Sequence, residues 1–131
     1  MNGPVPHIAI VDDEEPVRKA LGRLLEASGL AVACYAGGRE FLDDCARRRF
    51  DCVVLDLHMP AMSGLQVLAE LRRQRMPIPA VVMTAHNAPE MREQCFAAGA
   101  AEYLRKPLDE RVLRDAISAC LQNPRLTENH S

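Results

Sequence analysis

Short apolar runs alternate along the chain with longer stretches in which apolar residues recur at helical spacing. The runs are typical of strands covered on both faces, as in a parallel sheet. Five of them occur, at 7–11, 30–35, 52–55, 80–83 and 101–104. Each is followed by a stretch that predicts a helix. The residues that mark the helices are Val17, Leu21, Leu24, Leu25 and Ser28, then Phe41, Leu42 and Cys45, then Leu65, Leu68 and Leu71, then a weaker stretch at 89–98, and last Val112, Leu113, Ala116, Ile117, Cys120 and Leu121.

Glycine and proline residues mark the ends of these segments. Gly29 and Gly99 follow two of the predicted helices, where a glycine commonly closes the last turn. Gly37 and Gly38 end the second strand, and Met-Pro-Ile-Pro at 76–79 ends the third helix. Five strand–helix units in strict alternation predict an α/β fold in which a parallel sheet carries helices on both faces. Ligands of such folds bind beyond the carboxyl ends of the strands.

The composition fits one globular domain. A chain of 131 residues with 48% hydrophobic and 26% charged residues can bury its own core, which argues against a disordered, collagen-like or membrane class. The net charge of −2 and the scarcity of aromatic residues predict no direct binding of nucleic acid. The N-terminal segment has neither the basic nor the long apolar region of a leader. We therefore expect a cytoplasmic protein without a membrane span.

Five cysteines occur, at positions 34, 45, 52, 95 and 120. Their number is odd and no two have Cys-x-x-Cys spacing, which argues against a disulfide framework or a zinc site. The pattern predicts free, buried thiols in a reducing compartment.

Polar residues suited to chemistry follow four of the five predicted strands. Asp12 and Asp13 come after the first strand, Asp56 after the third, Thr84 after the fourth and Lys106 after the fifth. The carboxyl ends of parallel strands meet at one edge of a sheet, so these side chains should lie close together. Crowded carboxylates repel one another, and Mg²⁺ relieves that repulsion while leaving room for a phosphate oxygen. A lysine and a hydroxyl can hold the remaining phosphoryl oxygens. The pattern therefore predicts a Mg²⁺-assisted phosphoryl site with a carboxylate nucleophile.

Taken singly, each of these residues has an ordinary structural interpretation. The acids at 12–15 before Pro16 fit the N-terminus of a helix. Asp56 fits a turn cap, Thr84 a strand end and Lys106 a solvated surface. Tyr103 fits a core aromatic residue whose hydroxyl reaches the surface. Their joint placement at one sheet edge is what favours the functional interpretation.

Four motifs contain these residues: Val11-Asp12-Asp13-Glu14, Leu55-Asp56-Leu57-His58-Met59-Pro60 with Ser63-Gly64, Met83-Thr84-Ala85, and Ala98-Gly99-Ala100 through Tyr103-Leu104-Arg105-Lys106-Pro107. With these motifs the chain resembles the receiver domains of two-component response regulators over about residues 6–122. It is most similar to receivers attached to helix-turn-helix output domains of the nitrogen-fixation and nitrate-response type. The resemblance implies a flavodoxin-like, doubly wound (βα)5 sandwich with strand order 2-1-3-4-5 and a cis peptide bond before Pro107.

The resemblance also implies a function for each site residue. Asp56 is the phosphoacceptor, and Lys106 pairs with the phosphoryl group. Thr84 is the switch hydroxyl and Tyr103 the switch aromatic residue. Mg²⁺, for which Mn²⁺ can substitute, is held by Asp12, Asp13, Asp56 and the backbone carbonyl of His58. The residues expected at the rim of the site are His58, Met59, Ala85, His86 and Pro107.

The two rim histidines leave two interpretations open. His58 lies two residues after Asp56, and His86 lies two residues after Thr84. They are either exposed loop residues or groups that meet an attacking water molecule or a partner. A metal site on this pair is not expected, because neither has a Cys or His at ligand spacing.

The leading hypothesis is a phosphoryl-accepting signalling switch. Its partner is a sensor histidine kinase or a phosphotransfer protein, and it catalyses only its own phosphorylation and slow dephosphorylation. Alternatives are a phosphohydrolase, a pseudo-receiver that only binds proteins, and a flavin-binding domain. A phosphohydrolase usually needs a second Asp where His58 stands, intact Asp56, Thr84 and Lys106 argue against a pseudo-receiver, and no phosphate loop for a flavin follows the first strand.

Two further expectations concern the output of the switch. Residues 1–122 should form the receiver domain, and 123–131 a polar tail or the start of a linker to an output domain, unless the receiver stands alone. Phosphorylation should change the surface of the fourth helix, fifth strand and last helix, and allow self-association or partner docking there. The residues expected on that surface are Met91, Cys95, Arg105, Glu110, Arg111 and Arg114.

Overall fold

The computed structural model describes residues 4–86 and 88–122. Five strands and five helices alternate along this part of the chain, as the apolar pattern predicts. The expected tail at 123–131 lies outside the described residues. The strands are β1 (His7–Val11), β2 (Ala31–Tyr35), β3 (Cys52–Asp56), β4 (Ala80–Thr84) and β5 (Glu102–Arg105), and the helices are α1 (Glu15–Ala27), α2 (Gly38–Cys45), α3 (Gly64–Arg73), α4 (Pro89–Ala97) and α5 (Glu110–Gln122).

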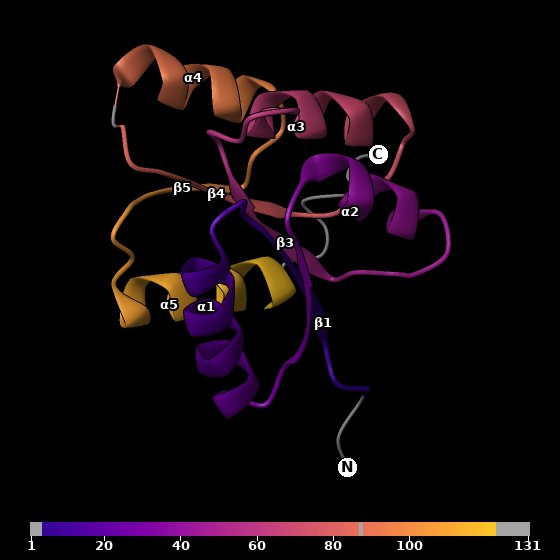
Figure 1. Ribbon diagram of the computed structural model, residues 1–131, viewed down its shortest axis with the longest axis vertical. Helices are drawn as coiled ribbons and strands as arrows, with labels where there is room; N and C mark the ends of the chain where they lie inside the picture. Colours follow the sequence, from indigo (N-terminus) through magenta and orange to yellow (C-terminus); the bar gives the residue numbers. More distant parts are fainter. Residues whose placement is uncertain (1–3, 87, 123–131) are drawn as a thin grey trace.

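All neighbouring strands are parallel, and their order is β2-β1-β3-β4-β5. This confirms the predicted sheet. Figure 1 shows α1 and α5 on one face and α2, α3 and α4 on the other. Alternate residues of each strand point to opposite faces of the sheet. Ile8 and Ile10 pack with α1 and α5, whereas Ala9 and Val11 pack on the opposite side. The central strands are therefore apolar on both faces.

The helix ends follow from local chemistry. Ser63 caps α3: its hydroxyl accepts from the Gln66 N–H at 3.2 Å, and the Gln66 side chain accepts from the Ser63 N–H at 2.9 Å. After α1 and α4 the chain turns through Gly29 and Gly99, which have φ values of 89° and 107°. Both glycines therefore supply the left-handed conformation that ends a helix, as predicted.

Burial corrects some sequence-based expectations. Val112 was predicted on the buried face of α5 but is 47% exposed, because the buried face runs through Leu113 and Val112 precedes it by one residue, about 100° around the helix. Cys34 is exposed on the edge strand β2, and Cys45 is half-buried. The other three cysteines are buried as expected, and all five are free thiols. In the described ranges, no helix combines the length and the apolar character that crossing a membrane requires.

Candidate functional site

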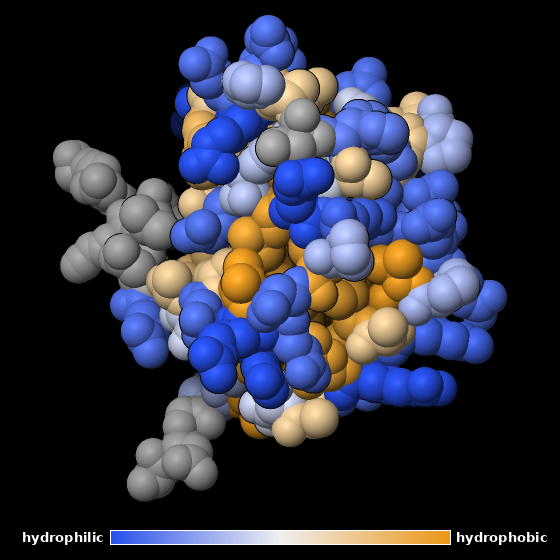
Figure 2. Space-filling model, turned by 90° about the vertical axis from the view of Figure 1, so that its left-hand side faces the viewer, coloured by the Kyte–Doolittle hydropathy of each residue, from blue (hydrophilic) through white to orange (hydrophobic). Residues whose placement is uncertain are grey.

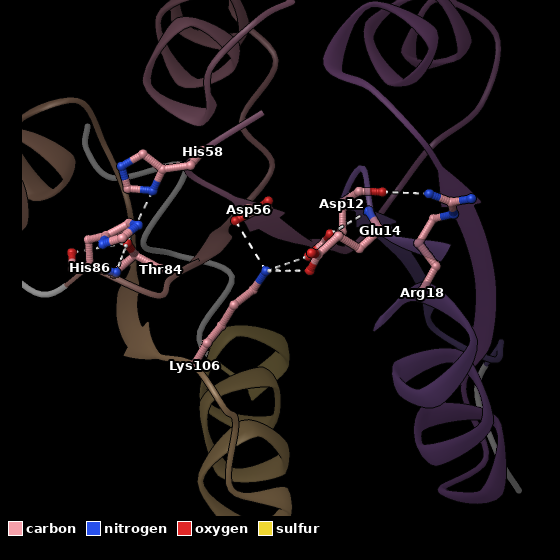
Figure 3. Close-up of polar contacts among 8 residues, drawn as sticks. All are labelled: Asp12, Glu14, Arg18, Asp56, His58, Thr84, His86 and Lys106. Atoms are coloured by element: carbon pink, nitrogen blue, oxygen red, sulfur yellow. Dashed lines mark hydrogen bonds and ion pairs between the residues drawn. The ribbon is translucent and has the colours of Figure 1, made fainter. Parts of the chain in front are cut away.

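The four polar positions predicted from the sequence all lie at the carboxyl edge of the sheet. β3 ends at Asp56 and β4 at Thr84, while Asp12 and Lys106 directly follow β1 and β5. Lys106 Nζ lies 2.9 Å from Asp12 Oδ2, 3.4 Å from Asp56 Oδ1 and 3.9 Å from Glu14 Oε1. Figure 3 shows the lysine reaching between the two aspartates. The peptide bond after Lys106 is cis, as the resemblance implies.

Asp12 is held in place by the start of α1. Its side chain is fully buried, and its Oδ1 accepts a hydrogen bond from the Glu14 N–H at 2.9 Å. Its backbone carbonyl accepts one from the Arg18 guanidinium at 2.8 Å. Sequence reasoning missed Arg18, because an arginine on an amphipathic helix is usually part of its solvated face. The helix therefore aims the Asp12 carboxylate at the site.

The electrostatics of the site centre on Asp56. Burial raises the pKa of Asp56 to about 6, and the nearby charge of Asp12 adds to this effect. Lys106 and the His58 backbone N–H lower the pKa of Asp56 only in part. Burial alone would lower the pKa of Lys106, but the hydrogen bond to Asp12 and the charges of both aspartates leave it above its ordinary value. The ammonium group therefore stays charged and partly compensates two buried carboxylates.

Asp12, Asp13 and Asp56 form a group suited to a hard cation. Each offers a carboxylate oxygen, and these atoms lie within 4.8 Å of one another. Asp12 and Asp56 are buried, whereas Asp13 is exposed, so the group opens to solvent. Three carboxylates with room for water and a phosphate oxygen match the ligands that Mg²⁺ prefers. The participation of the His58 carbonyl stays a prediction.

Thr84 is buried, and its hydroxyl is engaged by the loop that follows β4. Its Oγ1 accepts from the His86 N–H at 3.0 Å and lies 3.1 Å from the His86 carbonyl oxygen and 3.3 Å from His58 Nδ1. The two exposed histidine rings meet edge to face, with centres 5.1 Å apart. Figure 3 shows this group beside Asp56, with no dashed line between Thr84 and the aspartate. The histidines are thus packed against each other at the rim.

The surroundings of Tyr103, Cys95 and Met59 differ from the predictions. Tyr103 is only 8% exposed, and its hydroxyl is buried instead of reaching the surface. Cys95, expected on the α4 surface, is fully buried because it is the residue that α4 turns toward the sheet. Met59, expected at the rim, is 8% exposed and packs in the apolar cluster under α3. Ala85, His86 and Pro107 are exposed as expected of rim residues.

An apolar hollow of about 500 Å³ adjoins the site. It lies between α1 and the segment that follows β5, and Lys106 forms part of its wall. Figure 2, which faces this edge of the sheet, shows hydrophobic atoms near the middle of the face, bordered by hydrophilic residues. A second hollow, of about 630 Å³, lies where α3 ends and contains none of the predicted site residues. The other residues that line the first hollow are Pro16, Val17, Ala20, Leu21, Met83, Ala85, Pro107 and Leu108.

The fold and the site together define a class of protein: a five-stranded α/β domain with an acidic cluster and a lysine at its strand ends. The model of the response regulator receiver domain matches residues 8–118, and the chain belongs to this family. Its members generally bind Mg²⁺, and they are signalling proteins of two-component systems, in general not enzymes.

Named relatives agree with the predicted subgroup. The transcriptional regulatory protein FixJ of Rhizobium meliloti is 38% identical over 110 residues, which cover 84% of this chain and 54% of that protein. The response regulator protein TodT of Pseudomonas putida is 36% identical over 115 residues, which cover 88% and 51%. The crystal structure of FixJ-N superposes with a TM-score of 0.85 at 35% identity and covers 92% of this chain and 96% of that one. The chain spans about half the length of the curated relatives it matches.

Proposed function

We propose that Asp56 accepts a phosphoryl group from a phosphohistidine on a sensor histidine kinase or a phosphotransfer protein. An Asp56 carboxylate oxygen forms a bond to phosphorus while the bond from phosphorus to the donor imidazole nitrogen breaks. The imidazole leaves with the bonding electron pair and takes a proton from solvent. The observation that carries this proposal is the placement of Lys106 between Asp12 and Asp56, beside a carboxylate cluster open to solvent.

Each neighbour of Asp56 has a distinct contribution. A pKa of about 6 leaves Asp56 mostly ionised at neutral pH, as a nucleophile must be. Asp12, Asp13, Asp56 and the His58 carbonyl would hold Mg²⁺, or Mn²⁺ in its place, which would supply positive charge to offset the repulsion between carboxylates and phosphate. Lys106, which already lies beside Asp56, binds a phosphoryl oxygen. Lys106 thereby replaces part of its contact with Asp56 by one with the phosphoryl group.

The hollow beside Lys106 supports docking of the donor. It is apolar, it is formed by α1 and the segment after β5, and its wall includes Lys106, whose Nζ lies 3.4 Å from Asp56 Oδ1. A protein that delivers phosphohistidine must bring its ring to Asp56, and an apolar surface against this hollow would fix the approach. We therefore place the donor on this face.

The output is a change in conformation that begins at Thr84. To bond a phosphoryl oxygen, its hydroxyl has to release the His86 backbone and His58. The loop before α4 then moves, and the surface of α4, β5 and α5 changes with it. This surface exposes Arg105, Glu110, Arg111 and Arg114 around the half-buried Met91, a mixture that suits a reversible homodimer or partner.

The relatives suggest what this switch controls. FixJ is a transcriptional regulatory protein, so we propose a cytoplasmic regulator whose DNA contact comes from a separate output domain and not from this one. The domain itself binds neither nucleic acid nor membrane, and it turns over no substrate beyond its own aspartyl phosphate.

Removing the Asp56 carboxylate should abolish phosphoryl uptake. Incubation with phosphoramidate and Mg²⁺, followed by intact-mass analysis, should show one added phosphoryl group on the wild type and none on Asp56→Asn. The exposed Asp115 on α5 offers a matched change, and Asp115→Asn should take up phosphoryl as the wild type does. Full labelling of Asp56→Asn would show that the acceptor is another residue.

Removing the exposed member of the acidic cluster should separate metal binding from folding. Asp13→Ala deletes one Mg²⁺ ligand, so Mg²⁺ affinity measured by calorimetry should fall at least about tenfold. Because Asp13 is exposed and makes no ion pair among the described residues, the midpoint of urea unfolding without metal should stay unchanged. Unchanged Mg²⁺ affinity would remove Asp13 from the metal site.

A further inference from the structure

The hydroxyl group of Tyr103 does not account for the burial of this side chain. The side chain is 92% buried, yet the hydroxyl oxygen has no hydrogen-bond partner among the described residues. Burying a hydroxyl without a partner costs free energy. Contacts of the ring itself must therefore hold Tyr103 inside.

Two side chains of α4 cover this ring. The guanidinium carbon of Arg92 lies 5.7 Å from the centre of the Tyr103 ring and 5.1 Å from that of Phe96. The two aromatic rings are 6.5 Å apart between centres. Arg92 is exposed and Phe96 is 39% exposed, so both belong to the outer layer over Tyr103. A cation over the face of an aromatic ring is attracted by the ring quadrupole.

The Tyr103 ring is buried although the Thr84 hydroxyl is hydrogen-bonded to the loop that follows β4. Tyr103 pairs with Val82 across the sheet, and Thr84 follows Val82 by two residues, so both side chains point to the face that α4 covers. Thr84 nevertheless bonds the His86 backbone. Burial of Tyr103 in this structure therefore does not depend on movement of Thr84 toward Asp56.

We propose that Arg92 is a positioning residue that holds Tyr103 buried before any phosphoryl group arrives. The meaning of Tyr103 as a switch residue rests on the proposed function, but the contact with Arg92 does not. In this chain Tyr103 of β5 then points inward before phosphorylation, and phosphorylation acts through Thr84 and the loop that follows it. Tyr103 then needs no rotation on phosphorylation, because Arg92 already holds its ring inside.

The test follows Tyr103 in the unphosphorylated protein. The chain has two tyrosines, so labelling with 3-fluorotyrosine gives two fluorine resonances, and Tyr35→Phe identifies that of Tyr103. The access of a dissolved paramagnetic agent to each resonance reports exposure of the ring. In the wild type the Tyr103 resonance should be protected. In Arg92→Gln the ratio of exposed to buried Tyr103 should rise about two- to fivefold, the equivalent of one cation–π contact.

Two further variants make the result specific. Arg92→Lys keeps a cation over the rings and should stay close to the wild type. Arg23→Gln, an identical change at an exposed position of α1, should have no effect. An exposed Tyr103 in the wild type, unchanged protection in Arg92→Gln, or equal loss in Arg92→Lys and Arg92→Gln would each overturn the proposal. No phosphodonor is present, so these outcomes are independent of whether Asp56 accepts a phosphoryl group.

Discussion

The variant Gly64→Ala should lose both stability and phosphoryl uptake, although it adds only one methyl group. A Cβ at this position would lie 2.7 Å from the Asp56 carbonyl oxygen and 2.9 Å from the Leu57 Cα. Both neighbours are backbone atoms, so α3 and the end of β3 have to separate. We expect about 3 kcal/mol of destabilisation in urea unfolding. Uptake from phosphoramidate should slow about 100-fold, because Asp56 is displaced.

Gly22 provides the matched control for this variant. It lies in α1, where an added Cβ would meet Cys34 Sγ at 3.8 Å and Val32 Cγ1 at 3.9 Å, both ordinary contacts. Gly22→Ala should therefore stabilise the protein by about 0.5–1 kcal/mol through helix propensity. If Gly64→Ala retains wild-type stability and uptake, the close approach of α3 to β3 is not required for the site.

The variant Asp56→Asn should be more stable than the wild type when no divalent metal is present. In the wild type Asp56 is only 4% exposed, and folding raises the pKa of its carboxyl group to about 6 from an ordinary value of 3.8. Ionisation of Asp56 therefore costs the native state about 3 kcal/mol at pH 7.5. An amide carries no such charge, so urea unfolding of Asp56→Asn in EDTA should show a gain of about 2–3 kcal/mol.

The pH dependence of stability tests whether ionised Asp56 destabilises the folded protein. Because the folded state binds the Asp56 proton more tightly than the unfolded state does, the wild type gains stability as pH falls through about 6 toward 4. The advantage of Asp56→Asn should shrink over the same range. Mg²⁺ should also reduce it, because binding stabilises the folded wild type more than a variant with one ligand fewer. Equal stability of the two proteins at pH 7.5 in EDTA would contradict the cost assigned to Asp56.

The fold and the centre of the site could be predicted because both depend on regular geometry. In a strand that is apolar on both faces, the first polar residue marks the end of the strand. Asp56 and Thr84 are the last residues of their strands. Parallel strands then bring Asp12, Asp56 and Lys106 to one edge without any knowledge of their side-chain rotamers. The contacts of 2.9 and 3.4 Å from Lys106 to the two aspartates confirm that expectation.

The details that sequence reasoning missed depend on side-chain direction. α4 has little amphipathic pattern, so its sequence did not tell whether Cys95 or Arg92 faces outward. The buried Tyr103 hydroxyl and its cover by Arg92 follow from that choice. Arg18 was missed for a related reason: its target is a backbone carbonyl, which no residue pattern reveals. Loops pose the same difficulty, as the contact between His58 and Thr84 shows.

The ion pair between Asp12 and Lys106 joins residues 94 positions apart in the chain. A growing polypeptide acquires both buried aspartates in its first half but acquires their compensating cation only when the fifth strand has been made. Until then, closing the edge of the sheet around Asp12 and Asp56 confines two like charges without relief. Charge compensation at this edge of the sheet is thus tied to completion of the domain during synthesis. A partly made chain that had paired its first three strands would contain Asp12 and Asp56 but not the lysine that compensates their charge.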